Sequence, residues 1–217
     1  MIFSASVRKI KIRKFDMAET IKNKPNYTIF AGINGAGKTA LYNVLAPHTD
    51  LGTRVSVDDI AASLGDWRDT LVQLKAARSA MNLLAELIKN RVSINQETTL
   101  PGEAIVRFAK QAREAGYFIT LYFVGIENVE MAIDRVNERV AKGGHGIEEA
   151  VIRKRFASLS ANLARLIPYC DVVYLYDNSR RFRQVAVMHG SVMVDIDPDM
   201  PLWLRLVPGS PEYTGAV

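Results

Sequence analysis

The sequence predicts an α/β fold in which a mainly parallel β-sheet is covered by helices on both faces. Short apolar runs alternate with helical patterns of ten or more residues, which is typical of right-handed βαβ units. The run at 117–124 has almost no polar interruption, as expected for a strand in the buried middle of a parallel sheet. A glycine-rich loop joins the first regular strand to the helix that follows it.

Each element has its own local signal. Expected strands are the apolar runs at 27–31, 54–57, 92–95, 117–124 and 171–176. The first helix should open at Gly37 and stop by Pro47, and a longer helical region, interrupted near 65–66, should reach about residue 90. Pro101 should start the next helix and Gly116 should cap its end. Two further helices are expected at about 128–142 and 147–166.

Domain boundaries follow from these patterns. Residues 1–25 are predicted to be an N-terminal appendage, and residues 26–180 the core, including a helical lid at about 139–156. Residues 181–217 should form a hairpin, turning at 189–191, and a tail packed on the core. A chain of 217 residues is long enough to bury one sizeable core.

Composition excludes several classes of protein. The net charge of +5 invites a nucleic-acid partner, but outside 8–14 the basic residues are spread out, so such a partner is not favoured. One cysteine, Cys170, forms no internal disulfide and no metal cluster, and we expect a buried, inert thiol. No apolar stretch is long enough for a membrane span and no secretory signal is evident, so we expect a cytoplasmic protein.

Residues 32–39 read Gly-Ile-Asn-Gly-Ala-Gly-Lys-Thr, which satisfies the phosphate-loop pattern between a strand and a helix. Glycines let backbone N–H groups surround phosphate oxygens, and the positive end of the helix faces the same anion. Lys38 should reach the β- and γ-phosphates and Thr39 should bind Mg²⁺. The predicted fold class is therefore the three-layer αβα sandwich of P-loop NTPases. The protein is expected to bind ATP and Mg²⁺. The predicted nucleotide-binding residues are Gly32, Asn34, Gly35, Ala36, Gly37, Lys38 and Thr39.

The sequence lacks the signature motifs of other subtypes of P-loop protein. There is no Asn-Lys-x-Asp motif after the phosphate loop, as GTPases need, and no Leu-Ser-Gly-Gly-like motif, as transport ATPases need. The third strand ends in Asn-Gln-Glu instead of the Asp-Glu of motor ATPases. A compact kinase fits best by elimination.

Asp58 falls at the carboxyl end of the second strand, which one βαβ unit should return to the γ-phosphate. A carboxylate there could accept a proton from an acceptor hydroxyl or bind a Mg²⁺-coordinated water. Alternatively, Asp58 or Asp59 merely caps the next helix. Spacing alone does not decide between these readings.

Starting with the phosphate loop, several short motifs follow one another along the chain. They are Gly-x-Asn-Gly-Ala-Gly-Lys-Thr (32–39), Val-Asp-Asp-Ile-Ala (57–61), Glu-Thr-Thr-Leu (97–100), Arg-Val (135–136), Gly-Gly-His (143–145), Ile-Arg-Lys-Arg-Phe (152–156) and Leu-Tyr-Asp-Asn-Ser (175–179). Together they resemble the bacterial zeta-toxin family of P-loop kinases, which belong to toxin–antitoxin systems and have chromosomal relatives. The similarity runs from about residue 27 to residue 179 in the family's order, and the Glu-Thr-Thr-Leu, Gly-Gly-His and Leu-Tyr-Asp-Asn-Ser motifs are the specific ones.

The resemblance implies roles that the residues alone do not fix. It implies that Asp58 is the base facing the acceptor hydroxyl, and that Glu97 and Thr98 bind the acceptor. It also implies phosphorylation of a sugar nucleotide such as UDP-N-acetylglucosamine, and an antitoxin partner. The sequence departs from the family pattern at Ser56, at Ala40 and at 101–103.

Basic residues flank the Gly-Gly-His-Gly segment at 143–146, where an arginine-bearing lid could close over the phosphates. Arg139 and Arg153 are the first candidates, in line with the paired lid arginines of zeta toxins, followed by Arg155. The alternative is a solvated helix face, because glutamates stand at helical spacing from these arginines. His145, between glycines, could contact phosphate or orient the turn, and its setting does not suggest a zinc site.

Asn178 follows the last core strand, where P-loop kinases often hold adenine, although 177–179 is also good turn composition. The sequence therefore predicts an ATP-dependent small-molecule kinase with an alcohol acceptor. The main rival is a regulatory ATP-binding protein or ATPase without phosphotransfer to a small molecule. A nucleic-acid-associated ATPase is a third reading that rests only on charge.

Overall fold

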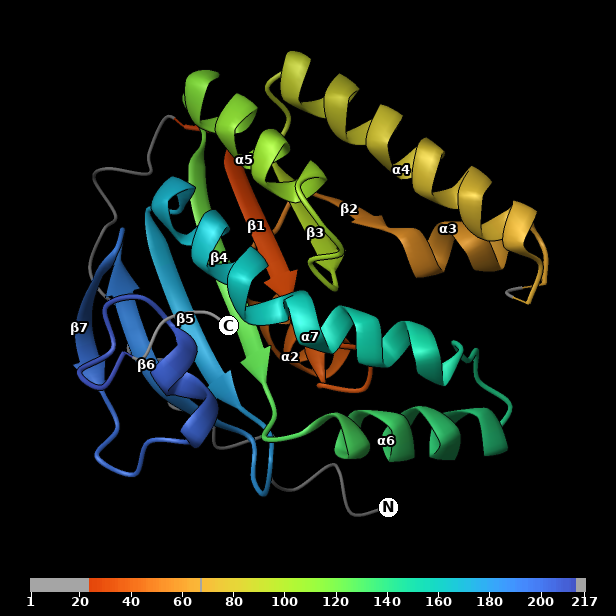
Figure 1. Cartoon of the computed structure of the whole chain (residues 1–217). Coiled ribbons are helices and arrows are strands. Elements are labelled where there is room, and N and C mark those ends of the chain that lie inside the picture. Colours follow the sequence, from red (N-terminus) through yellow and green to blue (C-terminus); the bar gives the residue numbers. More distant parts are fainter. Residues whose placement is uncertain (1–23, 67, 214–217) are drawn as a thin grey trace.

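The computed structural model describes residues 24–66 and 68–213 (Figure 1). Nearly all of the expected N-terminal appendage, 1–25, lies outside the described residues. The seven strands form one sheet in the order β2-β3-β1-β4-β5-β6-β7. Their bounds are β1 Asn26–Ala31, β2 Thr53–Ser56, β3 Ile94–Thr98, β4 Phe118–Gly125, β5 Val172–Asp177, β6 Arg183–His189 and β7 Val192–Ile196.

Strands β1 to β5 are parallel to one another, and the β6–β7 hairpin continues the sheet antiparallel to β5. Crossover helices connect the parallel strands, as the alternating sequence pattern predicts. The α-helices are α2 Lys38–Leu45, α3 Val57–Leu64, α4 Thr70–Lys89, α5 Ala104–Glu114, α6 Val129–Ala141 and α7 Glu149–Leu166. The predicted fold class, a mainly parallel sheet with flanking helices, is confirmed.

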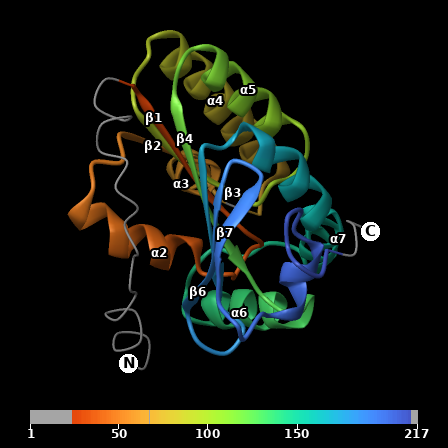
Figure 2. The same ribbon diagram turned by 90° about the vertical axis from the view of Figure 1, so that its left-hand side faces the viewer.

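Helices cover both faces of the sheet, giving three layers. Figure 2 shows α2 on one side of the sheet and α5 and α7 on the other. Aromatic rings fix the α2 side: Phe30, Tyr122 and Tyr174 are register partners on β1, β4 and β5, and neighbouring rings stack with centroids 5.3 and 5.0 Å apart. Tyr42 of α2 packs edge-on against Phe30 at 5.6 Å.

Strand β1 is the centre of the core, with Tyr27, Ile29, Phe30 and Ala31 fully buried between β3 and β4. Beyond the carboxyl ends of these strands lie α6 and the start of α7, joined by the segment 142–148 (Figure 1). Ligands of open α/β sheets bind at this edge. No helix among the described residues is both long and apolar enough to cross a lipid bilayer.

Three expected boundaries were wrong by a few residues. Strand β3 begins at Ile94 and not at Val92, because the Val92 N–H closes the end of α4 by donating to Leu87 O at 3.0 Å. Helix α5 begins at Ala104 and not at Pro101, because the left-handed Leu100 (φ 53°) and Gly102 (φ 150°) bracket that proline. Helix α7 begins at Glu149, since its N-cap, Glu148, is extended (φ −60°, ψ 137°).

Candidate functional site

The phosphate loop occupies the turn between β1 and α2, and two of its glycines are required by geometry. Gly32 has φ 143°, and a Cβ there would collide with the carbonyl oxygen of Val124 on β4. Gly37 has φ 108°, and a Cβ there would lie 2.7 Å from Nδ2 of Asn178. Larger residues at either position would push the loop off the sheet edge, so the chain needs glycine there to form the loop.

Lys38 is the first residue of α2, and its side chain is almost wholly buried under the loop. Its Nζ donates to Ile33 O at 3.1 Å and lies 3.9 Å from Oε1 of Glu97. Burial lowers the pKa of Lys38, Arg139 and Arg155 lower it further, and nearby carboxylates only partly oppose this. A bound phosphate would add negative charge beside this ammonium group, to which Glu97 is only a distant partner at 3.9 Å.

Glu97 lies at the end of β3, opposite Phe30 in the register with β1, and so beside the phosphate loop. Its carboxylate accepts hydrogen bonds from the Thr39 hydroxyl, at 3.0 and 3.1 Å, and from Nη2 of Arg54 at 2.8 Å. The guanidinium of Arg54 lies 4.0 Å above the Tyr42 ring. No sequence pattern pointed to Arg54, because its contact with Glu97 depends on how β2 and β3 pair.

The oxygen-bearing side chains of Thr39 and Glu97 suit Mg²⁺. Among the described residues, no group of three or more His, Cys, Asp and Glu side chains could hold a metal ion unaided. Mg²⁺ typically takes one or two protein oxygens and completes its shell with water and nucleotide phosphates. Thr39, hydrogen-bonded to Glu97 beside the phosphate loop, fits that donor set.

Asp58 lies in the first turn of α3, but it does not cap the helix. The cap is Ser56, whose Oγ accepts the Asp59 N–H at 3.2 Å. Asp58 Oδ2 instead lies 3.0 Å from Nε2 of His145, which comes from the segment between α6 and α7. Burial opposes ionisation of Asp58, but the His145 hydrogen bond and the charges of His145, Lys38 and Arg139 outweigh it and lower its pKa. The sequence predicted that His145 contacts phosphate or orients the turn, and it did not predict this contact with Asp58.

The three candidate lid arginines lie in different places. Arg139 of α6 lines the phosphate-loop cavity, and its buried Nε and Nη2 have no hydrogen-bond partner within the described part of the chain. Arg155 of α7 donates from Nη1 to Asn34 Oδ1 at 3.0 Å. Arg153 points to solvent and pairs with Glu130 at 2.8 Å and Glu149 at 2.7 Å. The structure thus brings Arg139 and Arg155 to the loop and leaves Arg153 on the outer surface.

Two residues hold the backbone of the phosphate loop from outside. The Asn178 amide donates to Ala36 O at 2.8 Å. Arg135 of α6 donates to Asn178 O at 2.8 Å and to Gly35 O at 3.4 Å. Asn178 therefore lies against the loop itself, and Arg135, which the sequence showed only as part of a motif, joins the loop to both β5 and α6.

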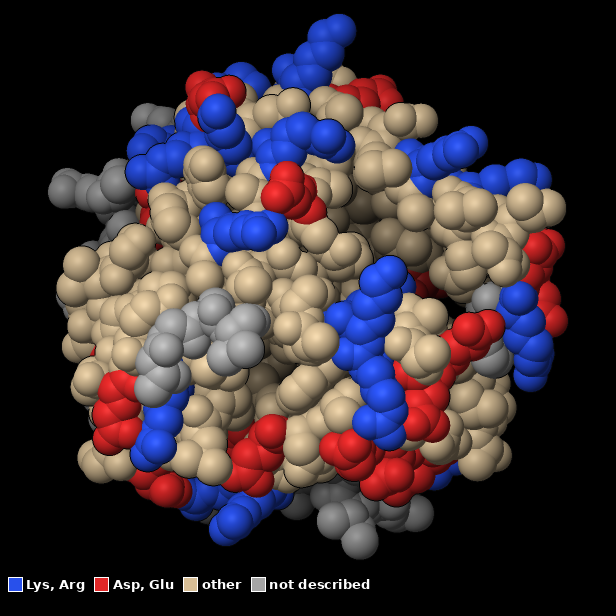
Figure 3. All heavy atoms as spheres, viewed as in Figure 1, with Lys and Arg blue, Asp and Glu red and all other residues tan. Residues whose placement is uncertain are grey.

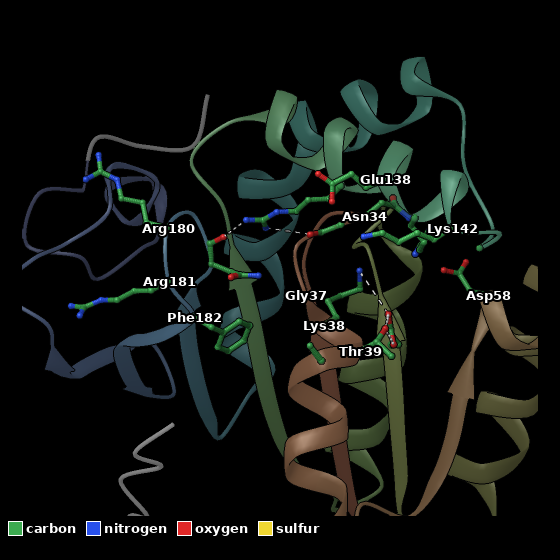
Figure 4. Close-up of a pocket in the computed structure, with 17 residues that line it drawn as sticks. Asn34, Gly37, Lys38, Thr39, Asp58, Glu138, Lys142, Arg180, Arg181 and Phe182 are labelled. Carbon is green, nitrogen blue, oxygen red and sulfur yellow. Dashed lines mark hydrogen bonds and ion pairs between the residues drawn. The ribbon is translucent and has the colours of Figure 1, made fainter. Parts of the chain in front are cut away.

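Two cavities meet at these residues. The first, of about 610 Å³, runs along the phosphate loop beneath α6, with Asp58 near one end and Arg180 and Arg181 at the other (Figure 4). The second, of about 300 Å³, lies between α4, α5 and the start of α7, and Thr98 lines it. Both cavities are lined by Asn34, Lys38, Asp58 and Glu97. Cys170 is buried away from both, and burial raises the pKa of its thiol.

The sequence matches one known protein family over most of its length. The profile of the family described as Zeta toxin matches residues 11–188. An uncharacterized protein of Haemophilus influenzae is 31% identical over 127 residues, which cover 58% of this chain and 89% of that protein.

Solved structures share the fold at low sequence identity. A chain of the AvrRxo1-ORF1:AvrRxo1-ORF2 complex, crystallised with sulphate ions, superposes with a TM-score of 0.67 at 18% identity, over 86% of this chain and 65% of that chain. A structure of the same complex with ATP superposes with a TM-score of 0.64 at 18% identity, over 88% of this chain and 66% of that chain. A structure from the PezAT chromosomal toxin–antitoxin system of Streptococcus pneumoniae superposes with a TM-score of 0.58 at 15% identity, over 74% of this chain and 70% of that chain. This chain thus spans slightly less than two thirds of the AvrRxo1 chains it matches.

Proposed function

This chain belongs to the zeta-toxin family of P-loop kinases, and from that premise we propose that it transfers the γ-phosphoryl group of ATP to a hydroxyl group of a small molecule. The observation that carries the proposal is the junction of the two cavities. A nucleotide in the first and an acceptor in the second would meet between Lys38, Asp58 and Glu97.

The triphosphate belongs in the first cavity, along the backbone N–H groups of the phosphate loop. Lys38 would contact the β- and γ-phosphates, and Arg139 and Arg155 would neutralise charge that develops on the transferred group. The unpartnered nitrogens of Arg139 support this, because a buried guanidinium N–H without an acceptor is costly. Thr39 would bind Mg²⁺ with Glu97 behind it, and the bound ion supplies further charge neutralisation.

The oxygen of the acceptor hydroxyl would bond to the γ-phosphorus as the bond to ADP breaks. Asp58 would accept the proton that this hydroxyl loses. The lowered pKa of Asp58 keeps the carboxylate ionised at neutral pH and able to orient that hydroxyl. His145 would hold the Asp58 carboxylate while the lid is closed, which couples lid closure to the position of the base. Asn178 would hold the phosphate loop in the shape that binds the nucleotide, through its hydrogen bond to Ala36 O.

Glu97 and Thr98 line the second cavity and would contact the acceptor at its reacting end. A sugar nucleotide such as UDP-N-acetylglucosamine is the acceptor that family membership suggests for a first assay. An antitoxin protein is a candidate partner, because a structural neighbour comes from a toxin–antitoxin system. We place the protein in the cytoplasm, where both ATP and such acceptors occur.

Radiolabelled [γ-³²P]ATP, incubated with the protein and a pool of metabolites, tests the proposal. The parent should label a metabolite, whereas Lys38→Ala and Asp58→Ala variants should not. Glu114→Gln, on the surface helix α5, is the matched control and should behave as the parent. If all label appears as inorganic phosphate whatever metabolites are present, the regulatory ATPase reading replaces the kinase reading.

A further inference from the structure

We infer that the second cavity takes an uncharged hydroxyl compound whose body is compact and apolar, an inference that rests on the proposed kinase function. The argument begins with the walls of the cavity. Helix α4 presents Ala77, Ala80, Met81 and Leu84, which recur at helical spacing along one side. Helix α5 and the segment before α7 add Ile105, Phe108 and Ile147 on the facing side.

The charges of the two cavities differ. The first cavity carries more cations than carboxylates: Lys38, Arg135, Arg139, Lys142, Arg180 and Arg181 against Asp58, Glu97 and Glu138. In the second cavity, the charged residues are Lys38 and Arg155 against Asp58 and Glu97. The triphosphate therefore has its counter-charges in the first cavity, and the second is balanced without a ligand.

Both cations of the second cavity are held at the end that it shares with the phosphate loop. Lys38 is bonded to the loop carbonyl of Ile33, and Arg155 is bonded to the loop residue Asn34. No described lining residue at the α4–α5 end is a cation. A phosphate, diphosphate or carboxylate group at that end would be removed from water without a counter-charge, which is unfavourable.

Size points the same way. A cavity of about 300 Å³ lies at the lower end of the ~300–1,000 Å³ range of small-molecule sites, which suits a compact ligand. Figure 3 shows the corresponding hollow between α4 and α7, with walls that are mostly neither basic nor acidic. The carboxylates lie at the loop end, where Asp58 and Glu97 would receive the hydroxyl, and Gln73 is the one polar residue that α4 adds to the lining. Shape and chemistry thus select a small alcohol that enters with its apolar part toward α4 and α5.

The inference is tested with two probes that share a ring and a hydroxymethyl group, 4-methylbenzyl alcohol and 4-(hydroxymethyl)benzoate. Binding of each to the full-length protein, saturated with a non-hydrolysable ATP analogue and Mg²⁺, is measured by NMR titration. The neutral probe should bind at least about tenfold more tightly, which corresponds to about 1.4 kcal/mol. UDP-N-acetylglucosamine serves as a third arm and should bind more weakly than the neutral probe.

Met81→Lys places a cation at the apolar end at a position that is 37% exposed, so the fold should tolerate it. This variant should reverse the preference in favour of the benzoate. Leu74→Lys, on the same helix but outside the cavity lining, is the matched control and should leave both affinities unchanged. Equal or tighter binding of the benzoate to the parent, or no binding of the neutral probe, overturns the inference.

Affinity for the ATP analogue, measured first by calorimetry, separates this inference from the proposed function. If the analogue does not bind, the kinase proposal itself fails. If the analogue binds and label passes to UDP-N-acetylglucosamine in preference to neutral alcohols, the kinase proposal stands and the neutral-acceptor inference is wrong.

Discussion

Replacing Glu97 by glutamine should destabilise the protein even without a ligand. The Glu97 carboxylate is 13% exposed and faces the Thr39 hydroxyl, Nη2 of Arg54 at 2.8 Å and the buried ammonium group of Lys38 at 3.9 Å. Glutamine keeps the shape but removes the charge, so Lys38 loses its nearest carboxylate and Arg54 keeps only its ion pair with Asp59 at 3.1 Å. Hydrogen bonds to charged groups contribute about 1.5–3 kcal/mol, and breaking a fully buried ion pair costs about 3–5 kcal/mol.

Because Glu97 is not fully buried, we expect the free energy of unfolding to fall by about 2–3 kcal/mol. At about 2–4 °C per kcal/mol for a chain of this size, Tm should fall by roughly 5–10 °C. Glu103→Gln is the matched control: Glu103 also contacts an arginine, Arg165 at 3.0 Å, but its side chain is 82% exposed. An exposed pair of this kind contributes about 0.5 kcal/mol, or a Tm change under about 2 °C.

Thermal and urea unfolding of nucleotide-free protein, followed by circular dichroism, measure both variants. An Arg54→Gln/Glu97→Gln double variant should lose less stability than the two single changes added together, because the pair is coupled. If Glu97→Gln is no less stable than Glu103→Gln, the carboxylate does not balance the buried cations, and the electrostatic account of the site is wrong.

Three further predictions concern the site. Because burial lowers the pKa of Lys38 below 10.5, its charge penalises the folded state at neutral pH, and this penalty fades as pH rises toward 10.5. Lys38→Met should therefore be more stable than the parent at pH 7 in urea titrations, with a gap that narrows at alkaline pH; a widening gap contradicts this. Arg155→Ala should lower kcat by roughly 100-fold or more in the radiolabel assay, and Arg153→Ala by less than about threefold; similar losses would place both arginines at the phosphates. Asn178→Ala should weaken ATP binding about tenfold by calorimetry, since it removes one hydrogen bond to the loop; unchanged affinity would show that this bond does not shape the loop.

The apolar periodicity and the phosphate-loop motif predicted most of this fold, because each of these signals depends only on residues that are close together in the sequence. The apolar run of β4 and the glycine pattern of the phosphate loop depend on neighbours along the chain, and both elements occur where predicted. The helix-capping reading of Asp58 fails for an equally local reason, since Ser56 already caps α3.

Contacts between distant segments were beyond the reach of the sequence. Arg54 meets Glu97 only because β2 pairs with β3, and His145 meets Asp58 only because the chain after α6 turns back over α3. Arg153 and Arg155 stand two residues apart on α7, so they point in different directions, and spacing did not show which one faces the loop.

The attachment of Arg135 to the phosphate loop limits how far the enzyme can open. Arg135 and Arg139 are one helical turn apart on α6; the first donates to Gly35 O of the loop and to Asn178 O after β5, and the second lines the phosphate cavity. Helix α6 is therefore attached near its middle, and we expect any movement that admits a nucleotide to occur in the portion that follows, around Gly143 and Gly144.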